Sequence, residues 1–498
     1  MAYQIKRGDC IDLSPEGLKL IEQHPNMLHE HTAQIPSSKR DWKFINIFNL
    51  WVGMIVSIAV YQVTSGLIVS GMTWYQALFT IVLGHTLVMI FAIVFGHFGT
   101  KYGLNYPMLS RIVFGTRGVI IPSIVRGLLG CFWFGVQTWI GGQALNAIMG
   151  VLIPSWSALG FTGLFISFLI FWLLNVIIAA SGGKGVKILE NIAAPMLVVL
   201  SFIVILWGLN LAGWNLSALL SVPVLQAKAD ADFWTIFWPA LSSMIAFDGT
   251  IALSMADFTR YSQDQKGQTL GQIISAPIMT LFIAFVGICG TAGAFLAFGK
   301  EIWEPSIIVA QFSNPLVVIL FSIFIIGAVL TTNVAANLVP PTNIIASLSK
   351  NKISYKWAAI IAAVLALLAQ PWNALSSAYT LVYTVCGALG ALLGPISGIY
   401  FVAYLFEHKT KFFLPDVFRS DAGGRYFYKA GWNIEACVAF FLTLLVVYSG
   451  IFFEPLKFMY DNSFVLGALL SAILYAVALL ISGRFKHFAQ LAQKDELE

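Results

Sequence analysis

Twelve apolar runs, each long enough to cross a lipid bilayer, constrain this chain more than any other feature of its sequence. A transmembrane helix needs about 20 mostly apolar residues. Only 10% of the 498 residues are charged, whereas a typical soluble domain carries about 25%. The runs cover residues 44–70, 75–97, 119–149, 159–180, 188–212, 233–256, 272–298, 306–330 with a polar continuation to about 347, 356–372, 377–405, 433–454 and 463–482. We therefore expect an all-α, polytopic membrane protein with twelve transmembrane helices in the lipid bilayer.

The positions of the basic residues predict how these helices are oriented. Of the 28 lysines and arginines, only Lys228, Lys300 and Lys457 fall in loops that follow odd-numbered runs. Loops rich in lysine and arginine stay on the cytoplasmic side. We therefore expect both termini in the cytoplasm and the protein in a cell membrane, plasma or inner. The net charge of +5 comes from these loops, so no nucleic-acid partner is expected. The polar segment up to Arg40 lacks a cleavable signal peptide.

The first ten helices divide into two halves, with helices one to five at about 43–212 and helices six to ten at about 233–405. Gly53 and Ser57 interrupt the first run, and Asp248 with Gly249 interrupts the sixth. Matching glycine-interrupted helices in two halves point to a binding site made from broken helices. We therefore expect an inverted repeat over 43–405, with helix six able to break at Gly249. Around this core lie an N-terminal tail at 1–42, a loop at 406–432, helices eleven and twelve at 433–482, and a C-terminal tail at 483–498.

The third run carries an aromatic ring and an amide on one helical face. Trp133 and Gln137 are four residues apart, so on a helix their side chains lie one above the other. An amide at membrane depth lacks water and needs a partner or a cavity. A flat indole beside an amide suits a small, flat, polar, uncharged molecule. The alternative is structural, with Trp133 packing between helices and Gln137 forming an interhelical hydrogen bond.

Polar groups also gather in the sixth and eighth runs. Asp248 is the only carboxylate placed near a membrane midplane, and an ionisable group there is a functional candidate. At the end of the eighth run, Thr331 and Thr332 offer hydroxyls, while Asn333 and Asn337 offer amides on one face. The alternative for each threonine is a hydroxyl bonded back to its own helix.

Other kinds of chemistry are not indicated by the sequence. It contains no GxxxxGK[ST] phosphate loop and no HExxH metal helix, and its five cysteines form no CxxC pair. His85, in the second run, is expected to be a satisfied core histidine. Because no nucleophile–base pair is visible, we expect neither a cofactor nor an enzyme. A membrane enzyme and a membrane sensor are the alternatives from other classes.

With these motifs in view, the chain resembles the nucleobase–cation symporter family 1, the permeases for cytosine, uracil, purines, allantoin and hydantoins. The resemblance covers roughly residues 40 to 480, and it is specific because several motifs occur together. These motifs are Lys101–Gly103 with Pro107 and Arg111–Gly115, Phe132–Trp139, Ala256–Tyr261, Asn333–Asn337 and Gln370–Trp372.

The resemblance implies a LeuT-type fold, in which a five-plus-five inverted repeat works by alternating access and two additional helices follow at the C-terminus. It implies that Trp133 stacks on the substrate and that Gln137 and Asn337 hydrogen-bond to it. Ser57 falls where relatives carry Gln, Asn or Ser. By position, it also implies a Na⁺ site made by the carbonyls of Gly53, Val56 and Ala328 and the hydroxyls of Thr331 and Thr332.

One departure from the family pattern limits the substrate. Where the sodium-coupled hydantoin member has glycine and a second stacking tryptophan, this chain has Phe247 and Asp248. Bulky aryl hydantoins are therefore disfavoured, whereas Asp248 can accept from a ring N–H or titrate, and Phe247 can share the stacking.

Together, these features predict a monomeric symporter that takes up a small planar ring, such as uracil, allantoin or hydantoin, together with a coupling cation. Na⁺ is favoured and H⁺ is the alternative ion. The alternative substrate is a vitamin such as thiamine or pyridoxine, carried with a proton.

Overall fold

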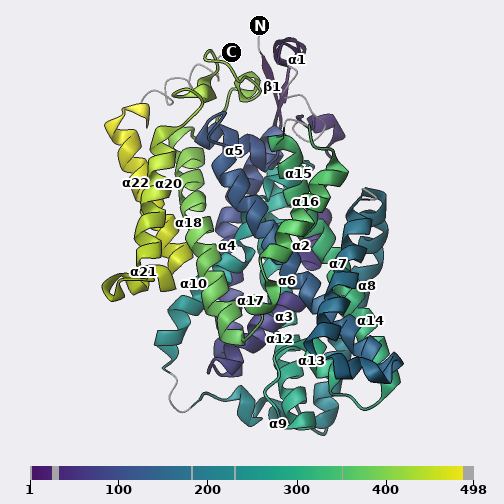
Figure 1. Ribbon diagram of the computed structural model, residues 1–498. Coiled ribbons are helices and arrows are strands. Elements are labelled where there is room, and N and C mark those ends of the chain that lie inside the picture. The colour runs from purple at the N-terminus through teal and green to yellow at the C-terminus, as the bar shows by residue number, and fades with distance from the viewer. Residues whose placement is uncertain (1–2, 25–32, 181–182, 229–231, 350–351, 486–498) are drawn as a thin grey trace.

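The computed structural model describes residues 3–24, 33–180, 183–228, 232–349 and 352–485, and it is a bundle of long helices (Figure 1). An antiparallel hairpin of β1 (Gln4–Arg7) and β2 (Cys10–Leu13) comes first, followed by α1 (Pro15–Glu22). The first half contains α2 (Phe44–Ile55), α3 (Ile58–Val69), α4 (Trp74–Tyr102), α5 (Tyr106–Phe114), α6 (Ile120–Leu152), α7 (Phe161–Ala180) and α8 (Gly183–Leu211). The second half contains α9 (Leu216–Leu220), α10 (Phe233–Leu253), α11 (Ala256–Thr259), α12 (Gln265–Phe298), α13 (Pro305–Ala310), α14 (Pro315–Thr332), the π-type turn η5 (Asn333–Leu338), α15 (Val339–Leu348), α16 (Tyr355–Leu368), α17 (Pro371–Ala374), η6 (Thr380–Val385), α18 (Cys386–Val402) and η7 (Ala403–Glu407). After it come α19 (Leu414–Val417), α20 (Ile434–Ser449), α21 (Lys457–Asp461) and α22 (Ser463–Ile481).

The lengths of these helices suit a membrane protein. Among the described residues, seven helices are long and apolar enough to cross a bilayer, or eight when α2 and α3 count as one bent span. Four shorter apolar helices cover Leu197–Leu211, Pro315–Leu330, Tyr355–Leu368 and Ile434–Ser449. The number of twelve spans, including the two additional C-terminal ones, stays a prediction.

The helices pack in three groups. In the first group, α4 packs against α10 and α12, and α12 also packs against α2 and α3. In the second, α6 packs against α7, α14, α15 and α16. Helices α18, α20 and α22 form the third group, which lies on the opposite side of the molecule from α7 and α8 (Figure 1). Helix α6 also contacts α10, so the first two groups meet along these two helices.

The first predicted span is broken between α2 and α3, which meet at an angle of 55°. Val56 and Ser57 leave the helical conformation, with ψ angles of 79° and 155°. The Ser57 N–H bonds to the Ile55 carbonyl at 2.7 Å, so the Gly53 carbonyl loses the donor that a continuous helix would supply. The sequence analysis indicated an interruption at Gly53 and Ser57, and the break lies at the C-terminal end of this stretch.

Two sequence-based boundaries were wrong. Helix α10 runs without interruption through Gly249 to Leu253, so the expected break at Gly249 does not occur. A side chain at Gly249 would approach the Phe464 ring to 2.8 Å, so this glycine allows α22 to pack closely. The eighth span starts at Pro315 rather than at residue 306, because the Asn314 side chain caps α14 and α13 is a separate short helix.

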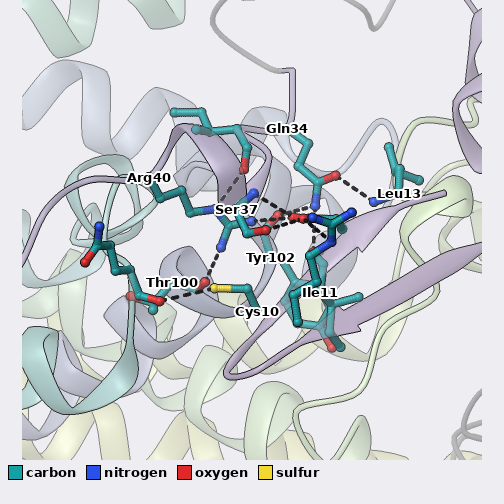
Figure 2. A network of polar contacts seen from close by, with 12 residues as sticks. Cys10, Ile11, Leu13, Gln34, Ser37, Arg40, Thr100 and Tyr102 are labelled. Carbon is teal, nitrogen blue, oxygen red and sulfur yellow. Dashed lines mark hydrogen bonds and ion pairs between the residues drawn. The ribbon is translucent and has the colours of Figure 1, made fainter. Parts of the chain in front are cut away.

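The N-terminal segment was expected only as a tail. Where the structure describes it, the segment is folded and packs against the ends of the helices. Arg40 is 3% exposed, and its Nη2 lies 3.2 Å from Asp12 Oδ1. Its remaining nitrogens donate to the Ile35 and Thr100 carbonyls (Figure 2). The Gln34 amide donates to the carbonyls of Ile11 and Tyr102. We call this cluster (Cys10, Ile11, Asp12, Leu13, Gln34, Ile35, Ser37, Arg40, Thr100, Tyr102) the N-terminal network.

Gly103 makes this contact possible. It ends α4 in the left-handed conformation, with φ 64°. A Cβ there would lie 2.3 Å from the Ile35 carbonyl oxygen and 2.5 Å from Arg40 Nη2, so only glycine fits at this position.

Candidate functional site

A cavity lies where α6 and α10 meet the break in the first helix, and we call it the central cavity. Its walls come from four separate parts of the chain, so it exists only in the folded molecule. It is lined by Met54, Ser57, Ala59, Arg126, Trp133, Gln137, Phe247, Asp248, Thr250, Ile251, Thr332, Ala336 and Asn337.

Trp133 and Gln137 present one face of α6 to this cavity, as their spacing predicts. Both are buried, and the indole Nε1 has no hydrogen-bond partner among the described residues. Phe247 from α10 meets the indole edge-on, with ring centroids 4.8 Å apart and planes 71° apart. Phe247 therefore forms a second aromatic wall, but it is not a plate parallel to Trp133.

A chain of amides behind the cavity fixes the direction of the hydrogen bond that Asn337 can make. Asn333 Nδ2 lies 3.2 Å from the Phe134 carbonyl, which can only accept, so the donor end of this amide points toward α6. Asn333 Oδ1 therefore faces Asn337 and accepts from its Nδ2 at 3.1 Å. The same Nδ2 of Asn333 also reaches Asn175 Oδ1 at 3.3 Å.

Because the Nδ2 of Asn337 is used in this chain of amides, its carbonyl oxygen faces the cavity as an acceptor. Gln137 makes no hydrogen bond to the described part of the protein, although it is only 9% exposed, so both ends of its amide remain available. The two amides therefore offer one fixed acceptor from Asn337 and an adjustable donor and acceptor from Gln137.

The residues expected to hold a cation lie on the break in helix one and on α14. Ser57 and Thr332 line the central cavity together, whereas Val56 directly precedes Ser57 and Gly53 lies four residues before it in the broken helix. The Thr332 hydroxyl donates to the Ala328 carbonyl at 3.2 Å, which leaves the hydroxyl lone pairs free. The Thr331 side chain lies outside the described residues. Every donor atom in this set is oxygen, which suits a hard cation.

The Ser57 side chain also has a structural role. Its hydroxyl oxygen accepts from the Val60 N–H at 3.3 Å and caps α3. The hydroxyl group keeps its own hydrogen in this bond, so Ser57 can donate to a ligand in the cavity.

The sequence analysis did not assign two ionisable side chains, His85 and Arg126, to the site. His85, expected to be satisfied in the core, places Nε2 3.3 Å from Asp248 Oδ2. Arg126 lines the cavity, donates from Nε to Ser254 Oγ at 2.9 Å, and has an Nη1 without a hydrogen-bond partner among the described residues. The spacing of Arg126, Trp133 and Gln137 along one helix could have revealed the arginine. No local spacing could have revealed His85, because it reaches Asp248 from another helix.

A cavity beside a broken first helix, in a bundle of helices of bilayer length, is typical of the class of membrane transporters. The chain belongs to the family of permeases for cytosine/purines, uracil, thiamine and allantoin, whose model matches residues 34–474. Members of this family are permeases, so the protein is a transporter and not an enzyme.

Individual relatives agree with this assignment. The chain is 33% identical to the allantoin permease of Bacillus subtilis, over 93% of this chain and 96% of the relative. It is 31% identical to the purine-uracil permease NCS1 of Arabidopsis thaliana, over 95% of this chain and 81% of the relative.

Two solved structures share the fold. An inward-facing structure of Mhp1 matches with a TM-score of 0.76 and 22% identity, covering 93% of this chain and 98% of that one. A closed structure of Mhp1, a nucleobase-cation-symport-1 family transporter with bromovinylhydantoin bound, matches with a TM-score of 0.74 and 23% identity, covering 94% and 97%.

Proposed function

We propose that this permease is a cation-coupled symporter that takes up a small planar ring with an N–H next to a carbonyl group, such as uracil, allantoin or hydantoin. The observation that carries the proposal is the combination of the Trp133 indole with amides of defined direction in one cavity. Stacking of a ring on an aromatic side chain contributes about 1–3 kcal/mol by analogy with base-binding platforms.

The hydrogen-bond directions at the site support rings of this type. The Asn337 oxygen needs an N–H on the ligand, and Gln137 can match an adjacent carbonyl and N–H at the same time. Rings of the lactam, imide or ureide type carry this sequence of groups. A site that relies on such bonds strongly rejects analogues that lack them, because its own buried polar groups are then left unpaired.

We propose Na⁺ as the coupling ion, bound by the carbonyls of Gly53, Val56 and Ala328 and the hydroxyls of Thr331 and Thr332. The Gly53 carbonyl, which loses its helical donor at the break, and the all-oxygen ligand set support this choice. The ion would join the first helix to α14, and substrate and ion together would favour the closed form. Coupling requires that the pair bind one conformation better than the other.

The runner-up is a proton-coupled carrier of a vitamin such as thiamine or pyridoxine. Asp248, a carboxylate in the cavity wall, is the observation in its favour, since a negative charge suits the cationic thiazolium ring. For either substrate we propose a monomer in a cell membrane, plasma or inner, with both termini in the cytoplasm.

The test is uptake of labelled uracil into proteoliposomes, with Na⁺ or choline outside at fixed pH. We expect uptake to need Na⁺, to be inhibited by allantoin and hydantoin, and to be inhibited much less by uracils methylated on a ring nitrogen. Uptake that is unchanged in choline and abolished by a protonophore would overturn the Na⁺ assignment. Inhibition by thiamine alone would overturn the ring assignment.

A further inference from the structure

Two ionisable side chains face each other beside the central cavity. His85 on α4 and Asp248 on α10 have side chains that are 0% and 3% exposed, with Nε2 and Oδ2 3.3 Å apart. The contact is not aligned as a hydrogen bond, and neither atom has another hydrogen-bond partner among the described residues. Among the described residues, the ion-pair contact of each atom is with the other.

The other ring nitrogen of His85 determines where its proton lies. Nδ1 is 2.9 Å from the Ile81 carbonyl oxygen, which can only accept, so Nδ1 carries the hydrogen. In a neutral ring Nε2 is then a bare lone pair. Turning the ring over would place C–H groups against both oxygens, so it offers no better arrangement.

A bare nitrogen and a carboxylate oxygen repel each other at this distance, so one added proton is needed between them. The proton can make His85 an imidazolium beside a carboxylate, or make Asp248 a carboxylic acid beside a neutral imidazole. In both forms the pair has no net charge. An unpaired carboxylate in this buried place would be far more costly.

Few other charged or titratable groups face this pair in the described part of the chain. In the described part of the chain, His85 is the one charged or titratable group in ion-pair contact with Asp248. Arg126 on α6 lines the same cavity and donates to Ser254 Oγ. Lys266 lies near the start of α12, and His97 and Lys101 lie at the far end of α4. On the remaining neighbouring elements, Tyr400 bonds to Ser110 and Tyr475 bonds to Glu407. Tyr61 of α3 lies near Ser65 and Thr291, Tyr383 lies near Ser70, and Asp461 of α21 lies near Lys457.

The pair is in contact with the ligand-binding surface. Asp248 lines the cavity with Trp133, Gln137 and Asn337. The Phe247 ring touches Trp133 on one side and His85 on the other, with centroids 4.8 Å and 6.0 Å apart. A ligand on the indole therefore lies within reach of the carboxyl group, whose state decides whether it accepts from the ligand or donates to it.

We propose that His85 and Asp248 together form a proton-binding site in the wall of the central cavity, and that binding of this proton is linked to binding of the ring. The presence of the proton rests on the geometry of the pair alone, whereas the link to the ring also rests on the proposed function. A neutral pair weakens the case for a cationic substrate, because it provides no net negative charge to balance a thiazolium.

The first measurement concerns the proton and needs no ligand. In purified protein we expect either a protonated imidazole, seen by ¹⁵N NMR of labelled histidine and lost in His85→Gln, or a carboxylic acid band in the infrared, lost in Asp248→Asn. Absence of both signals in correctly folded wild-type protein would overturn the proton site. This result does not depend on which substrate is carried, so it separates this proposal from the proposed function.

The second measurement is the dissociation constant of uracil between pH 5 and 9. Linkage to one proton predicts a change of up to about tenfold per pH unit in the wild type and a flat profile in Asp248→Asn and His85→Gln. Asp248→Glu should restore the pH dependence, which guards against a simple folding defect. His97→Gln, on the same helix but bonded to Tyr404, should behave as the wild type. A flat wild-type profile, or a variant of the pair that keeps the wild-type profile, would overturn the link.

Discussion

The N-terminal network and the central cavity are both buried polar clusters, but they differ in how far their polar groups are hydrogen-bonded to the rest of the protein. In the network, Asp12 accepts from the Ser37 N–H at 2.9 Å and lies beside Arg40, whose guanidinium donates to two carbonyls (Figure 2). Around the cavity, Trp133 Nε1 and Arg126 Nη1 have no hydrogen-bond partner within the described ranges, where Asp248 Oδ2 has only the unaligned contact with His85.

We interpret the polar groups of the network as structural and those of the cavity as available for binding a ligand. A buried donor or acceptor left without a partner costs about 1–3 kcal/mol, so a cluster that serves only stability satisfies its members. The cavity contains buried polar groups without protein partners among the described residues, and a bound molecule can supply partners for them. The network should therefore govern stability, whereas the cavity should govern binding.

The largest expected effect comes from Arg40→Ala. Removing one partner of a buried ion pair costs about 3–5 kcal/mol, so the melting temperature of the purified protein should fall clearly. Arg7→Ala is the matched control, because Arg7 lies 3.8 Å from the same Asp12 carboxylate but its side chain is 59% exposed. That exposed pair should contribute at most about 1 kcal/mol. An equal fall in melting temperature in the two variants would contradict the difference expected between the buried and the exposed partner of Asp12.

Trp133→Ala should act on binding. Loss of ring stacking, about 1–3 kcal/mol, predicts that uptake falls below detection or needs far more substrate, while the protein stays folded. Trp139→Ala is the control, since Trp139 is a buried tryptophan on the same helix that packs against Phe168 and Trp372 and does not line the cavity. Both variants lose similar packing, so normal uptake affinity in Trp133→Ala would refute the stacking role.

The smallest expected effect concerns Glu304, in the loop before α13. Burial raises the pKa of this carboxyl to about 7, and its main partner is the Gln143 amide at 3.1 Å. The folded protein therefore binds more protons than the unfolded chain between about pH 4.5 and pH 7, so stability should fall as pH rises through this window and then level off.

Glu304→Gln should remove this slope, because the glutamine side chain does not titrate. The measurement is the melting temperature from pH 5 to pH 8. Glu301→Gln, at a side chain that is 42% exposed, should leave the slope in place. A slope that persists in Glu304→Gln would mean that another group titrates.

Much of the site could be predicted from sequence because its elements are local. Trp133 and Gln137 share a face because they are four residues apart on a helix, and Ser57 lies at the break that the first apolar run indicated. The prediction failed at Gly249, where a glycine in an apolar run fits a break and a close helix contact equally well. Only the nearby Phe464 ring shows that it serves the contact.

By itself the sequence determined the helical segments, the membrane class and the family, since apolar run length, residue spacing and motifs are properties of the chain alone. Tertiary structure decided that His85 faces Asp248 and that Asn337 turns its oxygen to the cavity. The reason is physical: the direction of a hydrogen bond depends on which atom stands opposite. In this protein those atoms come from helices far apart in the chain.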